Sequence, residues 1–332
     1  MKRTSKLFAY IIVFVLAFSL LCACSGSGAA GGGNAGNTDG SIANTGSDTS
    51  DTVVMPDSSG MFTDADKTPS YDAASAVAIS IDGGAVTADS DSVSALGGKA
   101  TITEPGTYIV SGSGSNVTII VDVPSAITEK VRLVLSGASI VNDDFAAIYI
   151  KSADKTFIVL EGENSLAVTG SFAAIDYNKV DGVIFAKDNV VLQGEGSLTI
   201  TSSKHGIVGK DDVKITGGTI SVTAANHGIE ANDSVRVASA SLTIASGKNG
   251  IHVENTYDAT KGYFYMESGS LKITSGYEGI DASGAVEITG GTTDITSGDG
   301  SGKTLSSSDV STKGVKSSAD ILISGGEVST TG

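Results

Sequence analysis

Histidine and carboxylate side chains recur beside a repeated Gly-Ile dipeptide in the second half of the chain. The dipeptide begins at Gly206, Gly228 and Gly250, and successive copies are 22 residues apart. The residues that follow this dipeptide or its variants form one series: Tyr149, Asp176, Val208, Glu230, His252, Asp281 and Lys316. The residues that precede it form another: Ala146, Ala173, His205, His227, Asn249, Glu278 and Lys313. If the repeats stack, each series becomes a column of neighbouring side chains, so Glu230, His252 and Asp281 should be successive neighbours.

Such columns have the chemistry of a cation site. Calcium is bound by oxygen atoms of carboxylates, carbonyls and waters, and adjacent repeats can supply them together. We therefore expect bound calcium, with ligands among Glu278, Asp281, Asp299, Glu230, Asp211 and Asp212. Zinc bound by His227 and His252 is an alternative. A further alternative is that the acidic residues are solvated turn residues, since Asp is favoured in turns.

Aromatic side chains gather in an insertion at residues 255–265. Tyr263 and Tyr265 share strand parity, whereas Phe264 and Met266 should point inward. Exposed aromatic faces and planar polar groups recognise sugars. The candidate carbohydrate-binding residues are Tyr257, Tyr263, Tyr265, Tyr277 and His252. The alternative is that the tyrosines only cover the side of the fold.

The repeat itself predicts the fold. Runs such as Ile220-Ser-Val222 alternate apolar and polar residues and follow a Gly-Gly pair at Gly217-Gly218, which is typical of short strands joined by sharp turns. A unit of about 22 residues with three short strands cannot bury its apolar residues alone, so it must stack. We predict an all-β chain, a right-handed parallel β-helix formed as a single-stranded solenoid of ~22-residue coils over residues 101–332. The last coil stops partway, so we expect the domain to be truncated at its C-terminus.

The N-terminal residues predict export. A basic stretch containing Lys2 and Arg3 precedes an apolar run at residues 7–21, which is typical of a secretory signal. The sequence Leu21-Cys22-Ala23-Cys24 resembles a bacterial lipobox and implies cleavage before Cys24 and lipidation of its sulfur. We expect a lipoprotein signal peptide at 1–23, a disordered Gly/Ser/Asn linker at 24–60, and a poorly defined cap segment at 61–100. The protein would lie on the extracellular face of the bacterial cell membrane, held by its lipid alone. An uncleaved membrane anchor is the alternative.

Composition argues against a nucleic-acid partner and against cysteine-based sites. The formal net charge is -16, which argues against nucleic acid as a partner. Both cysteines precede residue 25, so the folded part has neither a disulfide nor a thiolate site.

Several segments together resemble a known family. They are Gly106-Thr-Tyr108, Val131-Arg-Leu133-Val-Leu135, Ala147-Ile148-Tyr149-Ile150 and Tyr277-Glu278-Gly279-Ile280. This pattern over residues 75–332 resembles the clostridial carbohydrate-binding domain-containing protein family. The resemblance implies a β-helix shaped like pectate lyases, with bound calcium, that binds cellulose or polygalacturonate. The family pattern often places Asp-Asp before Gly-Ile, but here the pairs are Lys204-His205, Asn226-His227 and Lys248-Asn249.

We therefore expect a cell-surface lipoprotein that binds polysaccharide without catalysis, with no prediction of its oligomeric state. Two alternatives stay open. One is a calcium-dependent lyase of uronate polymers, in which Lys204, Lys210 or Lys248 would be the base. The other is an adhesin or scaffold whose partner is a protein.

Overall fold

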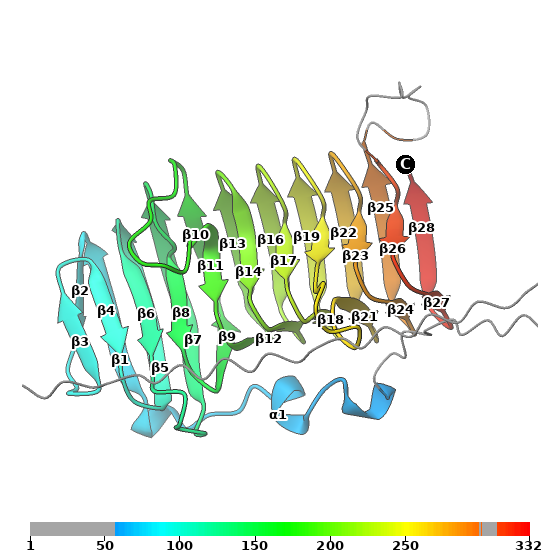
Figure 1. Ribbon diagram of the computed structural model, residues 1–332. Helices are drawn as coiled ribbons and strands as arrows, with labels where there is room; N and C mark the ends of the chain where they lie inside the picture. Colours follow the sequence, from blue (N-terminus) through cyan, green and yellow to red (C-terminus); the bar gives the residue numbers. More distant parts are fainter. Residues whose placement is uncertain (1–56, 299, 301–310) are drawn as a thin grey trace, which may run out of the picture. The chain divides into compact units, whose positions relative to one another are not determined.

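The computed structural model describes residues 57–298, 300 and 311–332. The predicted signal peptide at 1–23, the lipidation site Cys24, most of the linker at 24–60 and the predicted calcium ligand Asp299 lie outside the described residues. Within the described part the regular structure is almost entirely β-strand, as predicted, and the one α-helix spans four residues (Figure 1). No helix in this part of the chain is long and apolar enough to cross a membrane.

The strands form two large sheets, one of 18 strands and one of 10 strands. The 10-stranded sheet contains β3 (Val93–Leu96), β4 (Lys99–Ile102), β6 (Thr118–Asp122), β8 (Ile148–Ser152), β11 (Gly182–Ala186), β14 (His205–Gly209), β17 (Ile229–Ala231), β20 (Ile251–Val253), β23 (Ile280–Ala282) and β26 (Val315–Ser317). Pairing in it is parallel throughout, except for the antiparallel pair β3–β4.

The 18-stranded sheet starts as one layer and then divides. Its first strands are β1 (Val77–Gly83), β2 (Ala85–Ala88), β5 (Gly106–Ser115) and β7 (Val131–Asn142). The first half of the long strand β7 pairs with β9 and the second half pairs with β10, so two branches leave it. Branch 1 contains β9 (Lys155–Glu161), β12 (Asn189–Gly194), β15 (Asp212–Ile215), β18 (Ser234–Val237), β21 (Tyr263–Met266), β24 (Val286–Ile288) and β27 (Ile321–Ile323). Branch 2 contains β10 (Glu163–Val168), β13 (Ser197–Ser202), β16 (Thr219–Ala224), β19 (Ser241–Ser246), β22 (Ser270–Ser275), β25 (Thr292–Ser297) and β28 (Glu327–Thr331).

The predicted fold class needs a correction. The expected right-handed parallel β-helix, a single-stranded solenoid of ~22-residue coils, is wrong, because the strands belong to two large and mostly parallel sheets rather than to one closed solenoid. Two hairpin-like antiparallel pairs, β1–β2 and β3–β4, also occur where the sheets begin. A repeat length read from sequence specifies the stacking of strands, but not how the strands are divided among sheets.

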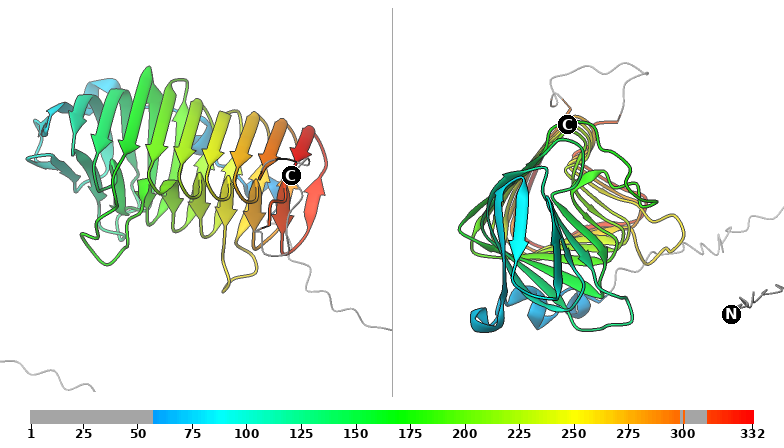
Figure 2. Two further views of the ribbon diagram at one scale, coloured as in Figure 1. Left: turned by 90° about the horizontal axis from the view of Figure 1, so that it is seen from above. Right: turned by 90° about the vertical axis from the view of Figure 1, so that its left-hand side faces the viewer.

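The apolar core lies between the sheets, and its order follows the repeat. Ile207, Ile229, Ile251 and Ile280 are paired in register on consecutive strands, and each is fully buried. Each such side chain stabilises the fold by about 2 kcal/mol or more. Successive strands overlie one another when the molecule is viewed end-on, on the right of Figure 2. Phe264 and Met266 point into this core, as the strand parity predicted.

Residues 57–76 form a strap that crosses the outer face of branch 1 (Figure 1). It contains two short 3₁₀ turns (Ser58–Gly60 and Ala73–Ser75) and helix α1 (Asp64–Lys67). Thr63 and Asp66 cap α1 reciprocally, each side chain accepting a hydrogen bond from the other's backbone N–H. The segment predicted as a cap, residues 61–100, thus contains most of the strap, the strands β1–β3 and the first two residues of β4.

Candidate functional site

A groove follows the corner where branch 1 turns into branch 2. Its main part is a concavity of about 670 Å³, within the range of about 300–1,000 Å³ that is usual for ligand sites. The lining consists of Pro69, residues 159–163, residues 194–197 and Thr219. A second concavity shares Pro69, Gly194, Glu195 and Thr219 with the first and extends to Ser241. The groove therefore spans several repeats, with strap residues on one side.

Glycine makes this corner sharp. Gly194 has a φ of +109° and Gly218 has a φ of +81°, a region that side chains with a Cβ rarely adopt. A Cβ on Gly194 would lie 2.5 Å from the carbonyl oxygen of Leu160 one repeat away. The backbones of successive repeats can approach closely only because this Cβ is missing, and the floor of the groove is therefore backbone.

Polar groups line the groove. Glu161, Glu163 and Glu195 place three carboxylates along it, while Ser197 and Thr219 add hydroxyl groups in register on neighbouring strands. Glu161 is fixed from the strap, because Tyr71 Oη donates a 2.6 Å hydrogen bond to its carboxylate. That hydrogen bond, with burial and the negative charge of Glu161, raises the pKa of Tyr71 to about 12. The groove can accept and donate hydrogen bonds to a polyhydroxylated ligand, and it carries negative charge.

The outer face of branch 2 continues this polar surface. Its outward positions are mostly small hydroxyl residues in register: Thr199, Ser221, Thr243, Lys272 and Asp294 form one row, and Thr201, Thr223, Ala245, Thr274 and Thr296 form the next. Most of these side chains are exposed. This flat hydroxyl face is an alternative contact surface to the groove.

The predicted columns of side chains are found on the 10-stranded sheet. The registers pair Val208 with Glu230, Glu230 with His252, His252 with Asp281 and Asp281 with Lys316, which confirms the predicted neighbours. Asp176 is not in this column, because Phe185 of β11 occupies the place between Tyr149 and Val208.

The prediction for Asp176 relied on Ala174-Ile175 as a variant of the Gly-Ile dipeptide, and this assignment was wrong. Ala174-Ile175 lies in the connection between β10 and β11, where Ile175 is half exposed, and Val183-Ile184 takes its place in the sheet. Gly182, not Ala173, consequently precedes His205 in the second column. Asp176 still reaches the first column, since its carboxylate accepts a hydrogen bond from the hydroxyl of Tyr149.

The three histidines of the chain form a stack beside the charged half of the column. His205 and His227 have ring centroids 5.1 Å apart, and His227 and His252 have centroids 4.8 Å apart, with the rings inclined by less than 20°. The Glu230 carboxylate lies beside the stack. Its Oε2 is 3.4 Å from Nδ1 of His205, and its Oε1 is 3.3 Å from Nζ of Lys210.

The members of the stack differ in basicity. Burial lowers the pKa of His227 to about 4, and the neighbouring His252 and His205 act in the same direction. Burial also lowers the pKa of His205, against the opposing charges of Glu230 and Asp181. At His252 burial is outweighed by the hydrogen bond and charge of Asp281, so its pKa is raised.

Most of the predicted calcium ligands already have basic partners. Arg236 donates to Asp212 at 2.9 Å. Lys316 lies 3.0 Å from Asp281 and 3.7 Å from Glu278. Glu230 contacts Lys210, as described above. The negative charge of these four carboxylates is already partly balanced, so each attracts a calcium ion less strongly than a carboxylate with no basic partner would.

Asp211 differs from the other predicted ligands. It precedes β15 at the corner where Asp188 precedes β12 and Asp233 precedes β18, and we call these three residues the aspartate ladder. Burial raises the pKa of Asp211 to about 6, and the charges of Asp233 and Asp188 add to this effect. Asp188 accepts a hydrogen bond from the backbone of Ala153, and Asp233 is 2.7 Å from Lys261. Carboxylates on successive repeats that repel one another in this way are the electrostatic setting that a hard cation such as calcium would relieve.

The predicted sugar-binding tyrosines are in three different settings. Tyr263 and Tyr265 are only 4% and 3% exposed, because Met61 and Phe62 of the strap pack over them, so the expectation that they form an accessible aromatic platform is wrong. Tyr257 is fully exposed within the insertion, and Tyr277 is half-buried in the connection that precedes β23. His252 lies within the histidine stack.

The groove was not among the sites predicted from the sequence. Its carboxylates lie beside turns: Glu161 ends β9, Glu163 begins β10 and Glu195 lies between β12 and β13, and glutamate is ordinary at such exposed positions. The recurring glycines at Gly194 and Gly218 were the available signal, because a close backbone approach in successive repeats creates a continuous corner.

Known proteins resemble this chain in sequence and in structure. A family described as carbohydrate-binding domain-containing protein matches residues 96–331. A carbohydrate-binding domain-containing protein of Acetivibrio thermocellus is 40% identical over 216 residues, which cover 63% of this chain and 75% of the relative. A solved structure of the polysaccharide lyase-like protein from C. thermocellum, a gadolinium derivative, has a TM-score of 0.67 and 32% sequence identity, and the match covers 76% of this chain and 99% of that one. The resemblance found in the sequence is thereby confirmed, and the chain belongs to the carbohydrate-binding domain-containing protein family.

Proposed function

We propose that the protein binds polysaccharide without catalysis, and that the groove between branches 1 and 2 is the contact site. The observation that carries the proposal is the continuity of this groove over several repeats, with carboxylates and hydroxyls along its length. Stacked strands repeat about every 4.8 Å, so a rod-like polymer can lie across several repeats and form similar hydrogen bonds at each. Membership of a carbohydrate-binding family supports the class of ligand.

The charge of the groove favours a neutral glucan of the cellulose type. Glu161, Glu163 and Glu195 would repel the carboxylates of polygalacturonate unless a cation lay between them. We therefore expect cellulose binding that does not depend on calcium, and polygalacturonate binding that does.

Calcium belongs to the proposal as a structural ion. The aspartate ladder would hold it, and the ion would neutralise carboxylates that otherwise repel one another across successive repeats.

Sedimentation with insoluble polysaccharide tests the proposed groove. Thr219→Arg places a long side chain in the groove, while Thr243→Arg places the same side chain on the flat hydroxyl face of the next strand, β19. We expect the first variant to lose binding to cellulose and the second to retain it. If only Thr243→Arg lost binding, the contact site would be the flat hydroxyl face instead. If the wild type itself did not bind cellulose, the proposal would be refuted.

The alternative activity is cleavage of uronate polymers by β-elimination. It is favoured by the description of the structural relative as polysaccharide lyase-like. Incubation with polygalacturonate, followed by ultraviolet absorbance of the unsaturated product, separates the two. A calcium-dependent rise in absorbance would show that the protein is a lyase and would overturn the proposal that it binds without catalysis.

We also propose that Cys24 carries a lipid and holds the protein on the outer face of the cell membrane. The support is the basic and apolar stretch before it and the small residue Ala23 at the position preceding the acceptor. Labelling of cells with a fatty-acid analogue should mark the wild type but not Cys24→Ala.

A further inference from the structure

The histidine stack contains ring nitrogens whose positions are not explained by hydrogen bonding. Nδ1 of His205 and Nδ1 of His227 are both buried and have no hydrogen-bond partner. The His205 side chain as a whole is only 7% exposed. Leaving a buried polar atom unpaired costs about 1–3 kcal/mol, so two such atoms on adjacent residues of one stack call for a physical explanation.

A carboxylate, that of Glu230, lies beside the unpaired nitrogen of His205 and close to His227. One ligand atom each of His205, His227 and Glu230 lies within 4.8 Å of the others. Nδ1 of His205 and Oε2 of Glu230 are 3.4 Å apart, too long for a strong hydrogen bond. Two ligands of a tetrahedral zinc ion, at about 2.0–2.2 Å from the metal, are separated by roughly 3.4 Å, so this pair already has the spacing that zinc requires.

The chemistry of this donor set differs from that of the aspartate ladder. Two imidazoles and one carboxylate suit zinc and similar transition metals, whereas calcium takes oxygen ligands alone. Lys210 contacts Oε1 of Glu230, the oxygen that is not directed at His205, so Oε2 remains for a metal. Adjacent repeats supply the residues: His205 begins β14, His227 immediately precedes Gly228, and Glu230 lies in β17.

We propose that His205, His227 and Glu230 form a binding site for a transition-metal ion of the zinc type. Three protein ligands leave a fourth tetrahedral position for water or another small ligand. The site uses His205 in place of His252, because His252 is directed to carboxylates on its other side: its Nδ1 is 3.4 Å from Asp281 and its Nε2 is 3.5 Å from Glu254.

Cobalt(II) titration followed by zinc displacement tests the site. The full chain is used with Cys22→Ser and Cys24→Ser in every sample, so that no thiolate competes for the metal. We expect one Co²⁺ per chain, visible ligand-field absorption of tetrahedral intensity, and displacement by Zn²⁺ but not by Ca²⁺. His205→Asn, His227→Asn and Glu230→Gln should each weaken Zn²⁺ binding by at least roughly 10- to 100-fold.

His252→Asn is the matched control, because it removes the third ring of the same stack but no proposed ligand. It should bind Zn²⁺ like the parent chain, and the Zn²⁺-induced rise in its melting temperature should be unchanged. The proposal is overturned if the parent binds neither ion stoichiometrically, or if His252→Asn loses the metal while His205→Asn keeps it. Far-ultraviolet circular dichroism confirms folding of each variant, and Glu230→Gln, which preserves side-chain shape, decides the outcome if a histidine variant fails to fold.

Discussion

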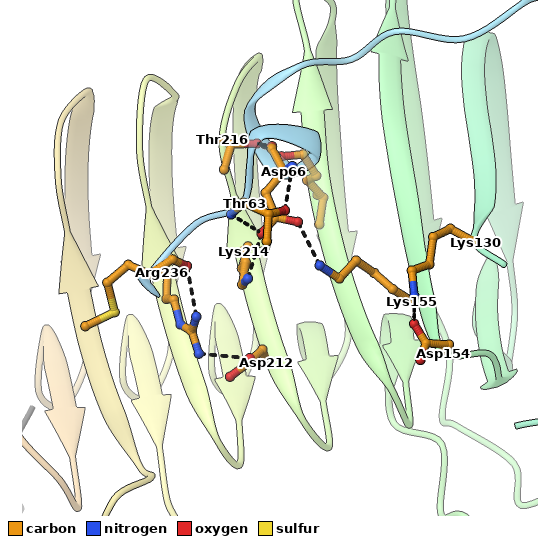
Figure 3. Close-up of polar contacts among 11 residues, drawn as sticks. Thr63, Asp66, Lys130, Asp154, Lys155, Asp212, Lys214, Thr216 and Arg236 are labelled. Carbon is orange, nitrogen blue, oxygen red and sulfur yellow. Dashed lines mark hydrogen bonds and ion pairs between the residues drawn. The ribbon is translucent and has the colours of Figure 1, made fainter. Parts of the chain in front are cut away.

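Replacement of Asp66 by asparagine should release the strap from branch 1. The Asp66 side chain is fully buried and accepts hydrogen bonds from Lys155 at 2.9 Å and from Lys214 at 2.7 Å (Figure 3). The backbone carbonyl of Asp66 also accepts a hydrogen bond from the Thr216 hydroxyl. Asp66→Asn keeps the shape of the side chain but removes the negative charge between the two ammonium groups.

The expected magnitude follows from the charge that is left behind. Lys214 is only 6% exposed, and removing one partner of a buried ion pair typically costs about 3–5 kcal/mol. The loss is limited by the free energy of docking the strap, because the strap can detach while the sheets stay folded. We therefore expect a loss of about 3 kcal/mol in local stability, which corresponds to roughly 100-fold faster hydrogen exchange at strap amides.

Hydrogen exchange measured by mass spectrometry is the direct assay, with Glu267→Gln as the matched control. Glu267 pairs with Lys67 at 2.7 Å, but both side chains are about two-fifths exposed, so this pair should contribute less than about 1 kcal/mol. Equal exchange of residues 57–76 in wild type and Asp66→Asn would refute the argument that this buried charge holds the strap. Faster exchange throughout both sheets would also refute it, because the strap would then not be a separate unit.

Acid gives an independent measurement on the same group. Burial would raise the pKa of Asp66, but hydrogen bonds from Lys214, the Thr63 backbone and Lys155 outweigh it and lower the pKa from 3.8 to about 2. Because the folded pKa is below the unfolded one, the contribution is complete above about pH 4 and is lost as the pH falls towards 2. That difference corresponds to about 2 kcal/mol, and Asp66→Asn should remove this part of the acid dependence.

Three further changes test the repeat and its corner. Gly228→Ala should destabilise the fold strongly, since its Cβ would lie 2.3 Å from a methyl group of Ile244, whereas Gly60→Ala, where nothing lies within 4 Å and φ is not positive, should change the melting temperature little. In EDTA, Asp211→Asn should raise the melting temperature by relieving repulsion from the other aspartates of the ladder, and in calcium it should lower the melting temperature by removing a ligand; the same sign in both conditions would exclude a calcium site at this corner. Phe264→Ala should cost about 3–5 kcal/mol in the free energy of unfolding, measured with denaturant, because the ring is fully buried between the sheets.

The sequence was sufficient to predict which side chains become neighbours wherever the Gly-Ile dipeptide itself recurs. Parallel strands in register convert each recurrence into adjacency, so the order Glu230, His252, Asp281 could be predicted without coordinates, although the first step spans 22 residues and the second spans 29. The prediction was wrong at Asp176, because an apolar dipeptide in a connection has the same local pattern as one in a strand. Pattern alone does not distinguish them when the spacing also varies.

Contacts made by the strap could not be predicted in this way. Asp66 and Lys214 are 148 residues apart, and nothing periodic relates them. Strand alternation correctly predicted that Tyr263 and Tyr265 point away from the core. They are nevertheless not accessible to a ligand, because the strap covers them. The division of the larger sheet at β7 likewise depends on tertiary pairing, because both halves of that strand have ordinary strand composition.

The strap also determines the path of mechanical load. A force applied through the chain that precedes residue 57 reaches Met61, whose carbonyl accepts a hydrogen bond from Arg236, and then Asp66, before it reaches the first strand at Val77. These bonds join the strap to β18 and β15 (Figure 3), so tension must detach the strap from branch 1 before it can pull on β1. Under tension the strap can therefore detach first and extend the chain by about 20 residues, while the sheets and the floor of the groove stay folded.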